Sequence, residues 1–156
     1  MIRDRENNTI SLDQEKYLED VLVKYNVQNI KPKKTPLPVG NKYEKNQTPV
    51  QDSERSGDFL YNRRIYQGIV GSLQFAVMGT RPDLAYATTT LAQFANNPSR
   101  KHMDAAKHVL AYVKLTKDLK LTYKNNSVGE IYGYVDSSWE DDKGNKRNLV
   151  LAFAIS

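Results

Sequence analysis

The chain has 156 residues, 39% of them hydrophobic and 26% charged, and it contains no cysteine. This composition is typical of a soluble globular protein and excludes a disordered tail, disulfides, thiolate metal sites and a cysteine nucleophile. The net charge of +5 is concentrated in residues 61–124, which hold ten basic and three acidic side chains.

Nothing in the sequence requires a membrane. The longest apolar run, residues 149–155, has seven residues, and a membrane span needs about 20. The N-terminus, Met1–Glu6, is charged and lacks the apolar core of a secretory signal. These features predict a cytoplasmic or nuclear location without membrane contact, and secretion or delivery into a host cell is left open.

Residues 1–29 predict a hairpin and a helix. Residues 2–5 and 9–12 are two short strands around an Asn7-Asn8 turn, because asparagine readily takes the left-handed conformation that a tight turn needs. Ser11 and Gln14 have the spacing of a capping box. Apolar residues between positions 17 and 25 then follow helical spacing.

Residues 30–60 predict an extended linker. Pro32, Pro36, Pro38 and Pro49 exclude a continuous helix there. The segment is too long for a tight connection, so it is expected either to wrap along a neighbouring surface or to bind a protein partner.

Three helices are predicted in residues 61–118. The first runs from about Tyr61 to Val77, with Gly68 and Gly71 allowing close backbone approach. The second starts at Pro82, which suits a first helical turn, and runs to about residue 95. The third is capped by Ser99 and reaches about residue 116.

Residues 119–156 predict strands at 119–124, 131–136 and 149–155, which would form an incomplete β-meander. The predicted class is therefore α+β: a hairpin and helix, a proline-rich linker, a three-helix segment and a β segment.

The third predicted helix carries a row of basic residues. Arg100, Lys107 and Lys114 recur every seven residues, and Lys117 extends the row. Such a row could follow a phosphate backbone, with Tyr112 or Tyr123 available to stack on bases. The alternative is an ordinary solvated lysine-rich surface.

The densest acidic cluster starts at Asp136 and includes residues 140–142. Carboxylates are the ligands that Mg²⁺ prefers, but two-metal chemistry needs several of them from different elements. Judged alone, the cluster is more typical of an acidic loop in solvent. His102 and His108 lie about 240° apart on a helix and cannot share a metal on one face.

Several strings together resemble copia-type retrotransposon polyproteins where reverse transcriptase ends and RNase H begins. The strings are Ile10–Tyr17, Thr35–Pro38, Tyr66–Phe75, Thr80–Ala87, Ala105–Lys114 and Gly133–Trp139. The resemblance covers nearly the whole chain. It implies the end of a reverse transcriptase region in 1–29, thumb-like or connection-like helices in 61–118, and the first strands of an RNase H sheet in 119–156.

By this resemblance, Asp136 occupies the position of the first metal-binding carboxylate of RNase H, and the family's remaining carboxylates would lie beyond Ser156. The expectation is therefore a protein without catalytic activity or a cofactor, in which Asp136 is vestigial. Mg²⁺ would bind only if another chain completed the site.

Three functions follow as hypotheses. The first is a catalytically incomplete polymerase-derived protein that retains weak nucleic-acid binding through residues 61–124, with Arg100, Lys107, Lys114 and Lys117 as the contacts. The second is a recruited protein-interaction module, such as a pathogen effector acting on a host, with residues 30–60 as the docking segment. The third is an RNase H or reverse transcriptase subunit that needs another chain.

Overall fold

The computed structural model describes residues 1–38, 40, 43, 57–124, 133–136 and 152–155. The chain divides into two compact units, Met1–Tyr123 and Lys124–Ser156. In the described part, helices and strands are mixed as an α+β class requires, and no helix combines the length and apolar character needed to cross a membrane.

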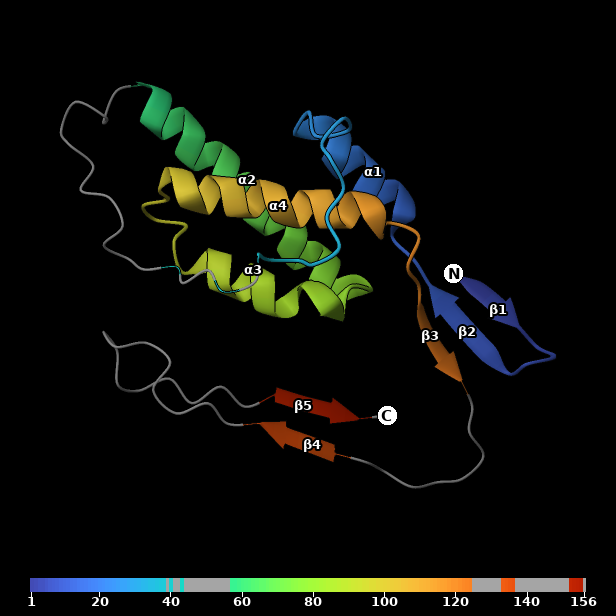
Figure 1. The fold of residues 1–156 in the computed structure, drawn as a ribbon. Helices are drawn as coiled ribbons and strands as arrows, with labels where there is room; N and C mark the ends of the chain where they lie inside the picture. Colours follow the sequence, from blue (N-terminus) through green and yellow to red (C-terminus); the bar gives the residue numbers. More distant parts are fainter. Residues whose placement is uncertain (39, 41–42, 44–56, 125–132, 137–151, 156) are drawn as a thin grey trace. The chain divides into compact units, whose positions relative to one another are not determined.

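The first unit begins with the predicted hairpin (Figure 1), formed by β1 (Ile2–Asp4) and β2 (Thr9–Leu12) in antiparallel register, with Arg3 opposite Ile10. Asn8 has a φ of 50°, the left-handed conformation expected at this turn. The Asp4 carboxylate accepts hydrogen bonds from the backbone amides of Glu6 and Asn7 at 3.0 and 3.1 Å. This Asx turn fixes the loop between the two strands.

Helix α1 (Glu15–Lys24) follows directly, but the predicted capping box is wrong. Gln14 is the N-cap residue and makes no side-chain cap hydrogen bond. The Ser11 hydroxyl instead lies 2.9 Å from the Thr122 hydroxyl on β3 (Leu121–Lys124). Ser11 cannot cap α1 because it is part of β2, which ends at Leu12, two residues before the N-cap Gln14.

Four α-helices supply the core of the first unit: α1, α2 (Gly57–Gly79), α3 (Ala85–Ala92) and α4 (Arg100–Leu115). A 3₁₀ turn, η2 (Pro82–Leu84), starts the α3 segment, with Pro82 in the first turn as expected. The large core side chains are almost completely buried: Leu18, Ile69, Leu73, Leu84, Leu91, Val109, Leu110 and Val113. Burying each of them contributes about 1.5–3 kcal/mol.

The N-terminus of α4 confirms the predicted Ser99 cap. The Ser99 hydroxyl accepts a hydrogen bond from the His102 amide, and the Ser99 amide donates to Nδ1 of the His102 ring at 3.0 Å. His102 is only 1% exposed and stacks on Phe94, with ring centroids 3.9 Å apart. Histidine thus takes the place of the glutamate usual in a capping box, with an aromatic contact added.

The two glycines of α2 differ. A Cβ at Gly68 would lie 2.7 Å from the Tyr25 hydroxyl, so this position does allow close approach. A Cβ at Gly71 would meet nothing within 4 Å, so the expectation of a close contact there is wrong. Gly71 lies on the exposed side of α2.

The strand pairing corrects one part of the predicted meander. Strand β3 pairs with β2, giving a sheet in the order β1-β2-β3. In the second unit, β4 (Gly133–Asp136) pairs antiparallel with β5 (Ala152–Ile155), as predicted for the last two strands. Residues 125–132, between the predicted strands, and the acidic residues 140–142 lie outside the described residues.

Candidate nucleic-acid interface

Residues 30–38, called the strap below, lie along α4 in the opposite direction (Figure 1). The Lys33 amide donates to the Ala111 carbonyl at 3.2 Å, and His108 Nε2 lies 3.0 Å from the Thr35 carbonyl. Prolines in the strap prevent it from forming a helix with its own backbone hydrogen bonds. Backbone N–H and C=O groups of the strap therefore bond to α4 instead. This part of the linker therefore wraps along a neighbouring surface, and its binding to a protein partner stays a prediction.

Lys114, one of the four predicted nucleic-acid contacts, has a structural partner. Its Nζ donates to the Ile30 carbonyl at 2.9 Å, and its side chain is half-buried. Lys114 therefore holds the start of the strap against α4, and its charge is less available to a ligand than the seven-residue spacing suggested.

Lys117 also has partners within the chain. Its Nζ binds the carboxylate of Glu19 and lies 3.7 Å from that of Glu15, both on α1. The hydrogen bond with Glu19 raises the pKa of Lys117, and the negative charges of both glutamates add to this effect. Lys117 therefore connects the end of α4 to α1.

Arg100 and Lys107 remain exposed on α4, and neither forms an ion pair within the described part of the chain. Seven residues are nearly two helical turns, so the two side chains lie on the same side of the helix. Asp104, between them, is also exposed and reduces the positive charge locally.

The strap brings three further cations to α4. Lys31, Lys33 and Lys34 are exposed, and the hydrogen bonds of the strap place them beside the helix that carries Lys107. The positive charge of Lys33 reaches His108: burial lowers the pKa of His108 and Lys33 lowers it further, while the bond to Thr35 opposes them. We call Lys31, Lys33, Lys34, Arg100 and Lys107 the basic surface.

The basic surface differs from the predicted row in a way that sequence spacing could not show. The predicted row lies on one helix, whereas three of the five cations of the basic surface come from the proline-rich segment. The signal was present in the Lys31 to Pro36 string, where lysines alternate with helix-breaking prolines. That string does not indicate that the strap packs against α4.

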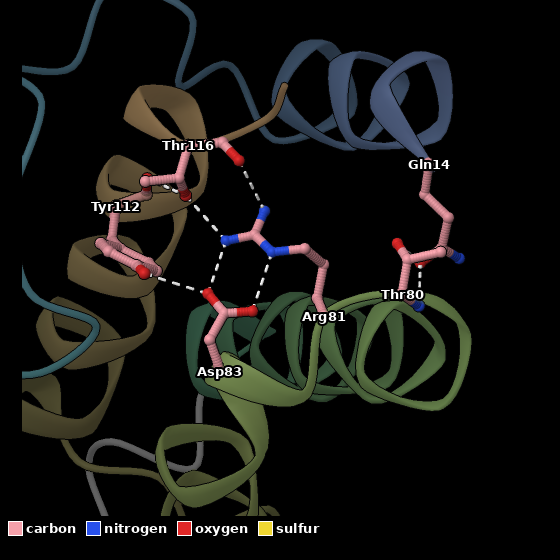
Figure 2. Close-up of polar contacts among 6 residues, drawn as sticks. All are labelled: Gln14, Thr80, Arg81, Asp83, Tyr112 and Thr116. Atoms are coloured by element: carbon pink, nitrogen blue, oxygen red, sulfur yellow. Dashed lines mark hydrogen bonds and ion pairs between the residues drawn. The ribbon is translucent and has the colours of Figure 1, made fainter. Parts of the chain in front are cut away.

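Arg81 forms the most extensive polar network that the structure describes (Figure 2). It is 1% exposed, and its guanidinium binds both oxygens of Asp83, at 2.9 and 2.8 Å. It also donates to the Thr116 carbonyl at 3.0 Å and to the Thr116 hydroxyl at 2.7 Å. The Tyr112 hydroxyl completes the network by donating to Asp83 at 3.0 Å.

The network has an effect on protonation. Burial raises the pKa of Asp83, but the hydrogen bonds and charge of Arg81, together with the Tyr112 hydroxyl, outweigh it and hold the pKa below its usual value. Burial and the neighbouring Asp83 raise the pKa of Tyr112. An ionised carboxylate held by arginine is the arrangement of a structural clamp between η2 and the end of α4.

A second polar contact lies next to the Arg81 network (Figure 2). The side-chain oxygen of Gln14 accepts hydrogen bonds from the Thr80 amide at 3.1 Å and from the Thr80 hydroxyl at 2.9 Å. Gly79 allows this approach, because a Cβ there would lie 2.5 Å from the Gln14 amide nitrogen. The Thr80–Asp83 string thus connects the start of α1, the end of α2 and the end of α4.

The predicted stacking tyrosines differ in availability. Tyr112 is half-buried, with its hydroxyl bound to Asp83, whereas Tyr123 on β3 is 58% exposed. Tyr86 on α3, which sequence reasoning passed over, is 76% exposed.

Asp136 is the last residue of β4, opposite Ala152 of β5. Within the described residues, no group of three or more histidine and acidic side chains could hold a metal ion. The role of Asp136 as a metal-binding carboxylate stays a prediction from the resemblance.

Comparison with known proteins shows where the sequence comes from. The chain is 33% identical over 148 residues to the retrovirus-related Pol polyprotein from transposon TNT 1-94 of Nicotiana tabacum, and 34% identical over 134 residues to that from transposon RE1 of Arabidopsis thaliana. The matches cover 95% and 86% of this chain but only 11% and 8% of the polyproteins. The chain is therefore homologous to one segment of the copia-type retrotransposon Pol polyproteins.

A different kind of relative shares a shorter region. The secreted RxLR effector protein 161 of Plasmopara viticola is 35% identical over 83 residues, which are 53% of this chain and 58% of that protein. No family model matches the chain. No solved structure matches it either, so the RNase H resemblance of residues 119–156 also stays a prediction.

Proposed function

We propose that this chain is a noncatalytic, nucleic-acid-binding protein derived from a retrotransposon Pol polyprotein. The observation that carries the proposal is the basic surface, where the strap adds Lys31, Lys33 and Lys34 to the exposed cations of α4. Homology to Pol polyproteins, which are retrovirus-related, supports a nucleic acid as the ligand.

The mode of binding follows from the side chains. Lysine ammonium groups are hydrated point charges on flexible stems, and they meet phosphate oxygens without reading base sequence. Each neutralised phosphate releases condensed counterions, so affinity falls as salt rises. We therefore propose weak, sequence-independent binding, with Lys114 and Lys117 fixing the scaffold and the five residues of the basic surface meeting phosphates.

A salt titration with matched variants tests the proposal. Binding of a labelled duplex and a labelled single strand is followed as salt is raised, for the parent chain and for the Lys31→Ala/Lys33→Ala/Lys34→Ala variant. The slope of log affinity against log salt should become shallower by about 2–3, since each lost phosphate contact removes about 0.7–0.9. Arg3→Ala/Arg5→Ala/Lys16→Ala, which removes three exposed cations outside the basic surface, is the control and should leave the slope unchanged.

Two results would overturn the binding proposal. One is the absence of binding at low salt. The other is an equal loss of slope in the control and in the strap variant, because the effect would then come from net charge and not from the basic surface.

The noncatalytic part is tested at Asp136. A nuclease assay on an RNA–DNA hybrid with Mg²⁺ should show no cleavage that depends on this residue. Cleavage by the parent chain that disappears in Asp136→Asn would instead support the RNase H alternative. A chain purified alone and then mixed with its Pol relatives would test whether another chain completes the site.

The effector relative favours a second candidate, a recruited protein-interaction module in which residues 30–60 dock a host protein. Point substitutions in the strap test this better than deletion of the linker, since deletion would also remove the bonds of the strap to α4. A purified host partner whose binding survives high salt and is lost on Leu37→Asp would favour this candidate over nucleic acid.

A further inference from the structure

We infer that the cavity between the strap and α3 takes an unpaired base of a single-stranded nucleic acid, stacked on Tyr86. This inference rests on the proposed function, and it adds a base-binding site to a phosphate-binding surface. The cavity has a volume of about 350 Å³. Its lining includes Pro36, Leu37 and Pro38 from the strap and Asp83 and Tyr86 from the opposite side.

The character of the walls fits a flat aromatic ligand. Proline rings and the Leu37 side chain present apolar surface on the strap side, and Tyr86 presents an aromatic ring on the other. Tyr86 is 76% exposed, although aromatic side chains of this size usually bury most of their area. An aromatic ring at the edge of a basic groove is how proteins bind single strands without sequence preference.

The cavity also offers hydrogen bonds to the edge of a base. The Oδ1 atom of Asp83 accepts one bond, from Arg81 Nε, so it retains a lone pair. A carboxylate oxygen of this kind can accept a hydrogen bond from the ring N–H of thymine or from the exocyclic amino group of another base.

Charge decides between occupants. Lys33 and Lys34 are exposed and lie three and two residues before Pro36, so a phosphate next to a bound base would meet cations. A proline-rich peptide would match the apolar walls but would leave these charges without a counterpart. A duplex would first have to unpair and unstack a base to fill the cavity, which costs free energy that a single strand does not spend. A single strand therefore fits best.

The test compares two oligonucleotides that differ only in their bases. The probes are a labelled oligothymidylate of about 12 nucleotides and an abasic strand of equal length, measured by fluorescence anisotropy at low salt. The parent chain should bind the oligothymidylate more tightly than the abasic strand. Tyr86→Ala should weaken oligothymidylate binding about fivefold or more and leave abasic binding unchanged, since one base stack is lost.

Two variants control the test. Tyr86→Phe keeps the ring and should retain binding. Phe75→Ala removes another exposed aromatic ring, on α2, and should also retain it. Circular dichroism of each variant checks that the exposed substitution leaves the fold intact.

The outcomes separate the two proposals. Equal affinity for the oligothymidylate and the abasic strand would overturn the base site and leave phosphate binding in place. Tyr86→Ala and Phe75→Ala weakening binding alike would also overturn it. Binding of a proline-rich peptide with no binding of either strand would overturn both the base site and the nucleic-acid function.

Discussion

Arg81 and Asp83 lie two residues apart and bind each other through two hydrogen bonds, from Nε to Oδ1 at 2.9 Å and from Nη2 to Oδ2 at 2.8 Å. Pro82 lies between them in the first turn of η2. The pair is anchored to α4 because Arg81 also binds Thr116. This short turn, which follows α2, is thereby connected to the end of α4, a helix remote from it in sequence.

The Asp83→Ala variant should be clearly destabilised. It leaves the Arg81 guanidinium, 1% exposed, without its counter-charge. Breaking such a pair from one side costs about 3 kcal/mol, because the remaining charge stays buried. Urea denaturation measures the loss in the free energy of unfolding. Asp104→Ala, an exposed aspartate on α4, should change it by less than about 0.5 kcal/mol.

Substitution by alanine should affect stability differently at the two glycines of α2. Gly71→Ala adds a methyl group in open space and should raise the free energy of unfolding by about 0.5–1 kcal/mol through helix propensity. Gly68→Ala should lose that gain, because its Cβ would lie 2.7 Å from the Tyr25 hydroxyl. Adding Tyr25→Phe should restore the gain. Equal melting temperatures for the two alanine variants would show that Tyr25 does not constrain Gly68.

Ser99→Ala and Ser11→Ala should differ. Ser99 caps α4, so its loss should cost about 1 kcal/mol. Ser11 bonds only to Thr122 among the described residues and does not cap α1, so its loss should cost less than about 0.5 kcal/mol. Thermal unfolding of both variants checks the difference. A larger loss for Ser11→Ala would restore the capping box that the sequence predicts at this helix.

Stability should depend on pH through His102. Burial lowers the pKa of His102 below its ordinary 6.5, and the charge of Lys101 lowers it further. The unfolded chain therefore takes up the proton first as pH falls. The contribution of neutral His102 is fully present above pH 6.5 and is lost as pH falls from there toward the lower pKa of the folded state.

The His102→Gln variant isolates this contribution. Glutamine also suits the third position of a capping box but does not titrate. Denaturant titrations at a series of pH values below neutral should show a smaller acid loss for the variant than for the parent chain. The pKa of His108 is also lowered by burial, so His108→Gln shows separately how much of the acid loss of stability comes from that histidine. Parallel pH curves for the parent chain and His102→Gln would contradict the assignment to His102.

Much of the fold could be predicted because local rules decide it. Ser99 lies three residues before His102 at a helix start, Asn8 directly precedes β2, and Pro82 suits a first turn, so each element begins where its residues require. The misses come from partners distant in sequence. Gln14 bonds to Thr80 across 66 positions, and Ser11 contacts Thr122 across 111. No spacing within either segment reveals such a contact.

At the candidate site, too, local features could be predicted from the sequence and contacts between distant residues could not. The seven-residue spacing correctly placed Arg100 and Lys107 on an exposed side of α4. It could not show that Lys114 binds Ile30 or that Lys117 binds Glu19, because those acceptors belong to the strap and to α1. The charge of the proline-rich segment could be counted, but its position against α4 depends on hydrogen bonds to Ala111 and His108.

The clamp at Arg81 changes how the Thr80–Asp83 string should be understood. Each side chain of that string with a described partner bonds within the protein: Thr80 to Gln14, Arg81 to Thr116, and Asp83 to Tyr112. The string is therefore a requirement for assembling helices. A chain that carries this string retains the contacts by which these helices pack.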